Sequence, residues 1–383
     1  MLRRVIITCC CVVLVTASLA AGQTATTAPA TTAPTTAPSS PKKLIEFGWD
    51  EPDTAFMRKH IAAMEQTPFD GTVFHTKFTD EQGKPQRFSN HVWGMRIFTD
   101  AELRPALDDL KATPFKRFTH NFHRFNVLPG NVDWFDDFSA IVSNARLFAR
   151  ITKEAKVRGI LFDIEPYDSP LWHYAKQRDA AMKSWEQYAA QARLRGREVM
   201  NAFQDGYPDV PVLLTFGYSW PLAHMMRKEG ATTLQGSEVG LLAPFLDGMF
   251  DAVRGNAKII DGFELSYGYR EDQRFDDARR RIRGEDGEVL KIVGNREKYR
   301  SHGSLAFGIW MDYDSGKKGW DPADASKNHF TPQQFEQSVR KALATTDAYV
   351  WIYTERAKWW DAEGKPEKLP AAYDQALRRA GGK

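Results

Sequence analysis

The chain has 383 residues, of which 42% are hydrophobic and 26% are charged, as in a globular protein with one large domain or two ordinary ones. The formal net charge of +3 is too small to indicate nucleic acid or an anionic membrane surface as a partner. All three cysteines, Cys9 to Cys11, lie near the N-terminus, so the rest of the chain must be stable without disulfide bonds.

The N-terminal residues have the pattern of a secretory signal peptide. A pair of arginines precedes an apolar run, Val5 to Leu19, that is too short to span a bilayer comfortably, and small residues follow it. We predict a signal peptide over residues 1–22, cleaved on export to a bacterial periplasm or exterior; the alternative is an uncleaved anchor. Residues 23–42, nearly all Thr, Ala, Pro and Ser, are predicted to form a disordered linker.

Residues 43–383 contain eight strand-like segments, and each is followed by a helical pattern. The predicted strands cover residues 44–50, 71–76, 117–125, 159–165, 210–218, 259–267, 304–312 and 348–355. Two of the helices begin at capping boxes, Thr99 with Glu102 and Thr331 with Gln334. Strands that alternate with helices form a parallel sheet, so we predict an α/β fold, a single (β/α)8 TIM barrel. The alternative is a doubly wound open sheet, but no Gly-rich phosphate loop follows the first strand.

The segment from Gly159 to Tyr167 combines a buried strand with two acids. Because side chains alternate along a strand, Leu161, Asp163 and Glu165 share one face, and the opposite face is wholly apolar. Pro166 ends the strand, since it cannot donate a ladder hydrogen bond. The sequence therefore predicts two carboxylates at the C-terminal tip of this strand.

In such barrels the active site lies at the C-terminal ends of the strands. Applying the same alternation to the other strands places further polar and aromatic residues there, and assigns residues such as Ile45 and Phe47 to the face that the helices cover. Tyr167, Tyr218 and Tyr267 are added because they follow strand ends. We predict that the substrate-binding residues are Glu46, Asp50, His75, Asn121, His123, Tyr167, Tyr218, Tyr267, Trp310, Asp312, Trp351 and Tyr353.

Carboxylates grouped with Trp and Tyr are typical of glycoside cleavage. One carboxyl group with a raised pKa protonates the leaving oxygen, and a second attacks the anomeric carbon or activates water. We predict Glu165 as the acid, with Asp163 beside it. Glu264 is the expected second carboxylate, and Glu355 is the alternative for that role. The predicted partner is a poly- or oligosaccharide.

A family resemblance follows from the same segment. Asp163-Ile-Glu-Pro-Tyr167 resembles the Asp-X-Glu end of strand four in chitinase-like glycoside hydrolases, which implies an acid at Glu165 and an assisting role for Asp163. The family's further aspartates in that strand correspond to Leu161 and Arg158 here, and Glu264-Leu-Ser-Tyr267 differs from its sixth-strand Met-X-Tyr-Asp. The resemblance therefore implies only a barrel glycoside hydrolase.

Two other functions remain open. His75, His123 and Asp163 could ligate the metal of a metal-dependent hydrolase, although two histidines on one strand would share a face only at an even offset and His120 and His123 are three apart. A non-catalytic carbohydrate-binding barrel is the second alternative. We expect no metal, no cofactor, no nucleic-acid partner and no stable membrane insertion after signal cleavage.

Overall fold

The computed structural model describes residues 41–167, 169–227, 231–314 and 319–383. Residues 41–383 form one compact unit. The predicted signal peptide, residues 1–22, and the predicted linker up to residue 40 lie outside the described residues, so both remain predictions. In the described part of the chain, no helix has both the length and the apolar character needed to cross a membrane.

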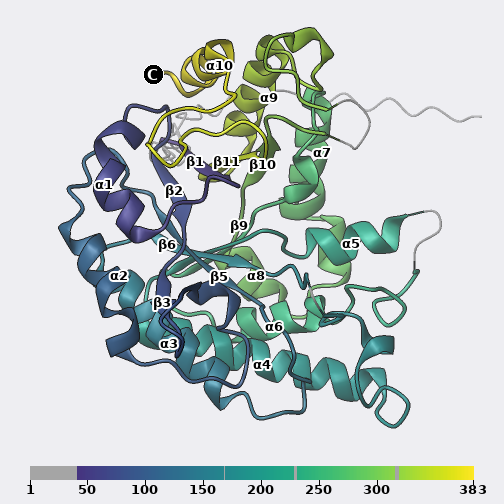
Figure 1. The fold of residues 1–383 in the computed structure, drawn as a ribbon. Helices are drawn as coiled ribbons and strands as arrows, with labels where there is room; N and C mark the ends of the chain where they lie inside the picture. Colours follow the sequence, from purple (N-terminus) through teal and green to yellow (C-terminus); the bar gives the residue numbers. More distant parts are fainter. Residues whose placement is uncertain (1–40, 168, 228–230, 315–318) are drawn as a thin grey trace, which may run out of the picture. The chain divides into compact units, whose positions relative to one another are not determined.

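The strands form one parallel sheet that closes into a barrel (Figure 1). In sheet order they are β10 (Phe307–Trp310), β11 (Tyr349–Thr354), β1 (Lys43–Gly48), β2 (Gly71–Phe74), β5 (Phe122–Asn126), β6 (Gly159–Asp163), β7 (Pro211–Leu214), β8 (Lys258–Asp261) and β9 (Gly303–Leu305). The segments β9 and β10 are two halves of one strand, interrupted at Ala306. Because β9 pairs with β8 and β10 pairs with β11, this strand closes the sheet, and the predicted eight-stranded barrel is confirmed.

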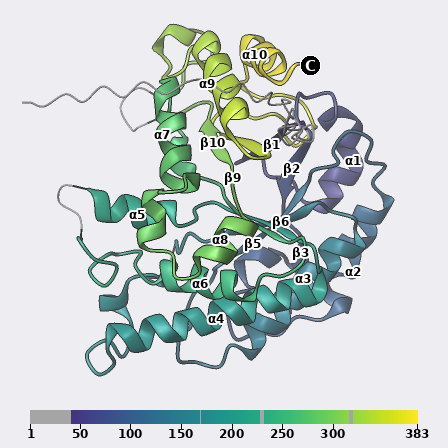
Figure 2. The ribbon, with the colours of Figure 1, turned by 180° about the vertical axis from the view of Figure 1, so that it is seen from behind.

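Helices cover the outside of the strands, as Figure 1 and the reverse view in Figure 2 show. They are α1 (Thr54–Met64), α2 (Asp100–Ala112), α3 (Ser139–Glu154), α4 (Trp185–Gly206), α5 (Ser219–Met226), α6 (Leu242–Ala252), α7 (Asp272–Arg283), α8 (Arg296–His302), α9 (Pro332–Thr345) and α10 (Ala371–Gly381). Both predicted capping boxes are present, at the starts of α2 and α9. The helix that follows β6, α4, begins only at Trp185, where Ser184 and Gln187 form a third capping box.

A short hairpin that the sequence did not suggest follows β2. Its strands β3 (Lys77–Thr79) and β4 (Pro85–Arg87) pair antiparallel. Asp80 shapes the turn by accepting hydrogen bonds from the backbone N–H groups of Gln82, at 3.0 Å, and Lys84, at 2.8 Å. The hairpin leads into the short helix η1 (Phe88–Asn90), which returns the chain to the barrel.

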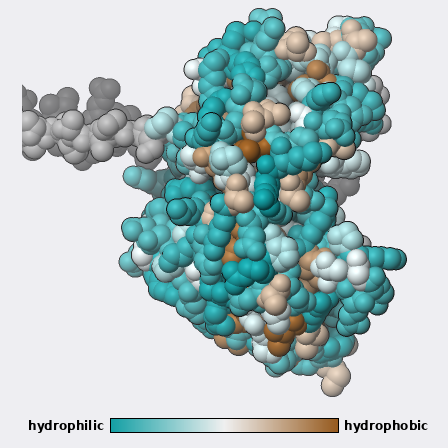
Figure 3. Space-filling view, turned by 60° about the vertical axis from the view of Figure 1, so that its left-hand side comes forward, coloured by the Kyte–Doolittle hydropathy of each residue, from teal (hydrophilic) through white to brown (hydrophobic). Residues whose placement is uncertain are grey.

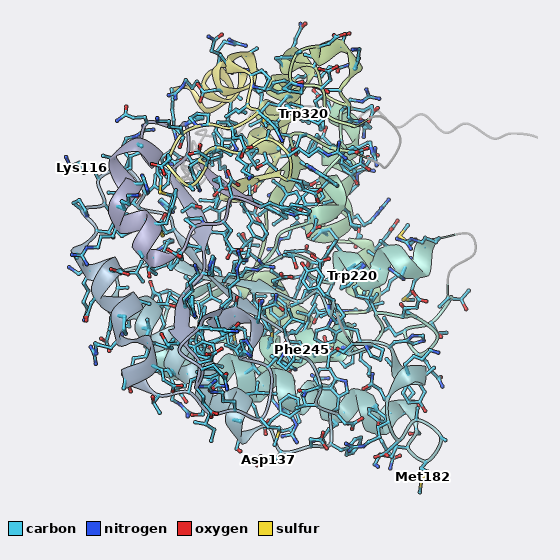
Figure 4. All side chains as sticks on the ribbon, viewed as in Figure 1. Lys116, Asp137, Met182, Trp220, Phe245 and Trp320 are labelled. Carbon is cyan, nitrogen blue, oxygen red and sulfur yellow. The ribbon has the colours of Figure 1, made fainter. Side chains whose placement is uncertain are left out.

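The hydrophobic core has two parts, one inside the barrel and one between the barrel and its helices. The inner part comprises Ile45, Phe47, Val73, Phe122, Leu161, Leu213, Ile260, Ala306, Tyr349 and Trp351. The outer part contains the predicted helix-facing residues of β6, β10 and β11, and it also buries Phe245 of α6, which Figure 4 labels. The prediction that Ile45 and Phe47 face the helices is wrong, since both point into the barrel.

The outer surface is mainly polar. The face in Figure 3 is largely hydrophilic, with hydrophobic residues in small separate groups. Among the described large hydrophobic side chains, Met182 is the most exposed, at 88%, and it projects from the loop before α4 (Figure 4). Trp49, which follows β1, is 68% exposed, and Tyr167, which follows β6, is 57% exposed. Both belong to the strand ends where the site is expected.

Candidate active site

The C-terminal ends of the strands surround a cavity of about 730 Å³, here called the mouth cavity. Its volume lies within the usual range for small-molecule sites. The lining residues come from all around the barrel: Phe47, Gly48, Trp49, Glu51, Arg87, Asn90, Arg124, Asn126, Leu128, Glu165, Tyr167, Glu264, Tyr267, Trp310, Tyr353 and Glu355. Of the four predicted catalytic residues, Glu165, Glu264 and Glu355 line this cavity.

Asp163 and Glu165 lie on the same face of the chain at the end of β6, as predicted. Asp163 is fully buried, and its Oδ1 accepts a hydrogen bond from the backbone N–H of Glu165 at 3.1 Å. The Tyr167 hydroxyl lies 3.3 Å from Asp163 Oδ2 and 3.3 Å from Glu165 Oε1, so it can donate to either carboxylate. Asp163 thus supports the end of the strand from below, and Glu165 reaches the cavity.

Arg124, on β5, lies at the centre of a buried ion-pair network under the cavity. Its guanidinium donates to Asp163 Oδ2 and, at 2.7 Å, to Glu51 Oε2. Burial alone would lower the pKa of Arg124, but Glu51 and Asp163 offset this effect and raise it well above its ordinary value. Burial also opposes ionisation of Glu51, yet Arg124, together with His75, lowers the pKa of that carboxyl to about 2. Arg87 also lies 3.4 Å from Glu51 Oε2, so the network joins two carboxylates and two guanidinium groups beside the mouth cavity.

Glu165 has a pKa matched to acid catalysis. Burial, and then the nearby charge of Asp163, raise the pKa of Glu165 to about 7. Burial, followed by the charges of Glu165 and Asp163, also raises the pKa of Glu264 well above its ordinary value. Ionisation of Glu165 therefore opposes ionisation of Glu264, so the two carboxyl groups are expected to titrate together rather than independently.

Glu264 reaches the cavity from a tight turn rather than from a strand. The strand β8 ends at Asp261, and Glu264 begins the short helix η3 (Glu264–Ser266) after Phe263, whose φ of 46° is unusual for a bulky residue. The carboxylate of Asp261 holds this turn by accepting from the N–H of Phe263 at 3.0 Å. A Cβ on Gly262 would lie 2.1 Å from the carbonyl oxygen of Leu214, so the close approach to β7 requires glycine.

Aromatic rings form one wall of the mouth cavity. Tyr267 and Tyr353 stack with ring centroids 5.1 Å apart, and the Trp310 ring meets both edge-on. The exposed Trp49 is held in place by its Nε1–H, which donates to the Tyr353 hydroxyl at 2.9 Å. The Tyr353 hydroxyl in turn lies 3.2 Å from Glu355 Oε1. Large apolar faces with polar edges are therefore presented beside the carboxylates.

Four predicted binding residues in or next to β1 and β5 do not line the mouth cavity: Glu46, Asn121 and His123 lie on the other side of the sheet, and Asp50 lies in the turn after β1, where it lines a small separate cavity. Glu46 is buried and accepts from the Thr72 hydroxyl, and Asp50 is buried and accepts from the backbone N–H of Trp359. Asn121 accepts from the N–H of Thr72 at 3.0 Å. These placements at the mouth were wrong, because Ile45 and Phe47 on β1, and Phe122 on β5, occupy the inward positions instead.

His123 was also assigned to the wrong face of its strand. Its ring stacks between Phe74, at 4.9 Å, and Phe148, at 3.8 Å. Its two ring nitrogens lie within hydrogen-bonding distance of Thr152, at 2.9 Å, and Thr76, at 3.1 Å. Burial lowers the pKa of His123 to about 3, so the ring is neutral. His123 is a packing residue of the outer core.

Four other predicted binding residues have structural contacts instead. His75 is buried with its Nδ1 3.4 Å from Glu51 Oε1. The buried Tyr218 hydroxyl donates to Asp247 at 2.6 Å, and Trp351 fills the barrel and donates from Nε1 to the Gly262 carbonyl at 2.8 Å. Asp312 accepts backbone N–H groups from three successive residues, 355–357, and thereby fixes the turn after β11.

These positions also bear on the alternative metal site. His123 lies on the outer side of the sheet, whereas Asp163 lies on the inner side and is paired with Arg124. The proposed set of His75, His123 and Asp163 therefore does not converge on one point. Within the described ranges, no cluster of three or more His, Cys, Asp or Glu side chains could hold a metal ion.

Several residues of the site were missed from the sequence. Arg124 and Asn126 are in phase with Phe122 on β5, and Arg87 and Asn90 come from the hairpin region. Glu51, the residue directly after the predicted first strand, is the main partner of Arg124. An arginine inside a strand flanked by buried phenylalanines was the available signal, because such a charge needs a buried carboxylate partner.

No family model and no curated protein matches this chain. Solved structures do resemble it. Active domain 2 of a thermostable chitinase from Pyrococcus furiosus is 9% identical over 89% of this chain and 95% of its own, with a TM-score of 0.44. A glycoside hydrolase family 5 enzyme from Prevotella bryantii is 10% identical over 87% and 88%, with a TM-score of 0.45. An endocellulase from Pyrococcus horikoshii is 12% identical over 88% of each chain, with a TM-score of 0.40.

These structural neighbours are glycosidases, and all three were determined with carbohydrate bound. At such identities no residue position can be transferred from them to this chain. The roles of Glu165 and Glu264 must therefore be argued from their own surroundings.

Proposed function

We propose that the protein is an exported glycoside hydrolase that cleaves a poly- or oligosaccharide with Glu165 as the general acid. The observation that carries this proposal is the carboxyl group of Glu165, which lines the mouth cavity with a pKa raised to about 7. A group with this pKa is protonated often enough to donate near neutral pH, and it also becomes a competent base after donating. Burial and a neighbouring carboxylate, here Asp163, are the usual causes of a raised pKa in a catalytic carboxylic acid.

Glu264 is the proposed second carboxylate. Glu264 lines the same cavity as Glu165, and the charge of Glu165 is among the causes that raise the pKa of Glu264. When Glu165 is protonated, its charge no longer opposes ionisation of Glu264, and the ionised Glu264 can act on the anomeric carbon or on a water molecule. Glu355 is the weaker candidate, since it is bonded to Tyr353 and lies beside Asp312.

The surroundings of the pair also suit a sugar. The rings of Trp49, Tyr267, Trp310 and Tyr353 offer faces for the C–H surfaces of a pyranose, and Arg87, Asn90 and Asn126 offer hydrogen-bond donors for its hydroxyl groups. Arg124 is already paired with two carboxylates. We therefore expect it to hold Asp163 in position rather than to recognise an anionic substrate.

The test begins with wild-type protein on cello-, xylo-, manno- and chito-hexaose, because the sugar is not specified by the site. Hydrolysis of none of these would contradict the proposed activity and favour a non-catalytic carbohydrate-binding barrel. On the best substrate, Glu165→Gln and Glu264→Gln should each lower kcat by about 10²- to 10⁴-fold or more while the circular dichroism spectrum stays unchanged. Near wild-type turnover by Glu165→Gln would refute its assignment.

The two roles can be told apart with an activated aryl glycoside of the same sugar. A good leaving group needs little protonation, so loss of the acid should be far less damaging on this substrate than loss of the second carboxylate. Glu165→Gln should therefore recover activity on the aryl glycoside and Glu264→Gln should not. The reverse pattern would exchange the two roles. Full activity of Glu264→Gln together with an inactive Glu355→Gln would assign the second role to Glu355.

A further inference from the structure

A second cavity, of about 380 Å³, adjoins the mouth cavity. It is formed by the loop after β6, by α5 and by the residues before α6, and it is here called the side cavity. Glu165 and Tyr167 line both cavities. These two residues therefore stand on the boundary between the two spaces, and Glu165 is the only carboxylate among the described lining residues that faces both.

This placement has a chemical meaning for a general acid. The oxygen that receives the proton joins two sugar rings, so the acid must contact the binding spaces of both rings. The second carboxylate acts at the anomeric carbon and so belongs to the ring that carries this carbon. Because Glu264 and Glu355 line only the mouth cavity, the ring that is attacked belongs there.

We infer that the side cavity binds the leaving part of the substrate, and that the protein cleaves inside a carbohydrate chain rather than removing small groups from its end. This inference rests on the proposed function. In the reaction, Glu165 gives its proton to the bridging oxygen as the bond from that oxygen to the anomeric carbon breaks, and the leaving sugar departs as an alcohol through the side cavity. Water supplies a hydroxyl group to the anomeric carbon, and its other proton restores the protonated carboxyl group.

Trp220 is the main surface for a sugar in the side cavity. It lies at the start of α5 (Figure 4), and its ring stacks on Phe216 with centroids 4.7 Å apart and an interplanar angle of 25°. The ring is half-buried and held by this stack, so little side-chain entropy remains to be lost on binding. His173 and Glu238 line the same cavity and supply groups for sugar hydroxyls.

The mouth cavity also continues on another side. A third cavity, of about 200 Å³, shares Trp49 and Glu51 with it. The exposed Trp49 thus lies between the mouth cavity and this third space, as Tyr167 lies between the mouth cavity and the side cavity. Three linked spaces with an aromatic residue at each junction suit a chain of several sugar units better than a single terminal ring.

The first experiment uses wild-type protein and the glycan from the hexaose panel that it cleaves fastest. We compare kcat/KM for leaving groups of increasing size: the glycosyl fluoride, whose leaving group occupies almost no space, and oligosaccharides that place one, two or three sugar units on the leaving side. The inference predicts that kcat/KM for the oligosaccharides rises with the number of these units, and that end-labelled hexaose is cut at internal bonds. Oligosaccharide rates independent of this number would overturn it.

The second experiment compares Trp220→Ala with Trp185→Ala. Trp185 is a matched control, a half-buried tryptophan at the start of α4 that packs edge-on against Tyr174 and lines none of the three cavities. Trp220→Ala should lower kcat/KM for the hexaose on the order of tenfold more than for the glycosyl fluoride, whereas Trp185→Ala should leave the ratio of the two values unchanged. Equal ratios in the two variants would overturn the inference.

The two proposals fail in different ways. An active Glu165→Gln variant would remove the proposed acid, whatever Trp220 does. An inactive Glu165→Gln variant combined with no effect of leaving-group length would preserve the hydrolase and remove only the side-cavity assignment. If Trp220→Ala does not fold, Trp220→Leu keeps an apolar side chain against Phe216 and the same ratio is measured.

Discussion

Replacing Glu165 by glutamine should stabilise the folded protein at neutral pH, although it should greatly lower the hydrolysis of oligosaccharides. The pKa of Glu165 is raised from its ordinary value of 4.5 to about 7, chiefly by burial and then by Asp163. Ionising this group therefore costs more in the folded protein than in the unfolded chain. A difference of about 2.5 between the two pKa values corresponds to about 3 kcal/mol. Glutamine has a similar shape and carries no charge at any pH, so the variant avoids this cost.

The sign of the effect depends on pH. Below about pH 4.5 the carboxyl group is protonated in both states, so wild type and variant should differ little. Between about pH 4.5 and 7 the unfolded chain has released its proton while the folded protein still holds it, and wild-type stability falls relative to the variant. Above about pH 7 the difference should stay constant at up to about 3 kcal/mol. Glutamine also removes a charge that raises the pKa of Glu264, which adds to the gain.

Urea unfolding of both proteins at a series of pH values from 4 to 8.5 would measure this difference, with equal slopes showing that the unfolded states are comparable. Glu81→Gln is a suitable control, because Glu81 is an exposed residue in the turn of the β3–β4 hairpin. A free-energy difference between wild type and Glu165→Gln that does not change with pH would refute the reasoning. So would a variant that becomes less stable than wild type as the pH rises.

Four further outcomes are expected. Asp163→Asn removes the charge that helps to raise the pKa of Glu165, so the fall of kcat/KM at high pH should move to lower pH in a pH–rate profile. Arg124→Ala removes the main cation beside the buried Asp163 and Glu51 and should cost about 3–5 kcal/mol in thermal or urea unfolding, with Arg124→Lys intermediate. Elemental analysis and chelation should reveal no metal required for activity; stoichiometric zinc whose removal abolishes activity would oppose this. Mass spectrometry of the exported protein should find a mature chain that begins near Gly22 and lacks the three cysteines.

The barrel could be predicted from the sequence because its strands and helices alternate regularly and its helix caps are explicit. The orientation of β6 was also readable, since one face is entirely apolar and the other ends in Asp163 and Glu165. For β1 and β5 the sequence did not predict which side chains face the inside of the barrel. Both faces of these strands are buried in a closed barrel, so alternation alone does not distinguish the inner from the outer face. On β5, His123 packs between aromatic rings outside, while Arg124 points inside.

Residues whose positions depend on contacts with distant parts of the chain could not be predicted from strand alternation. Arg124 is stabilised by Glu51, which lies 73 positions earlier in the chain, and only the closed barrel brings the two together. Glu264 reaches the cavity for a reason other than the expected one, since it lies on a turn that follows a residue with positive φ rather than on a strand in phase with Gly262. Turn geometry of this kind depends on the carboxylate of Asp261 and on the close contact of Gly262 with β7. Neither feature produces a periodic pattern in the sequence.

The β3–β4 hairpin has a consequence for how this protein could be modified. It is joined to the barrel at its two ends, contributes no strand to the closed sheet, and leads directly to Arg87 and Asn90 at the edge of the mouth cavity. The acid pair belongs to β6 and to the turn after β8, so hairpin and acids are separate parts of the architecture. A library confined to the exposed positions of residues 77–90, with the buried Phe78 and Phe88 kept, could therefore alter sugar preference while leaving both the acids and the barrel intact, which makes this segment the natural place to introduce new specificity.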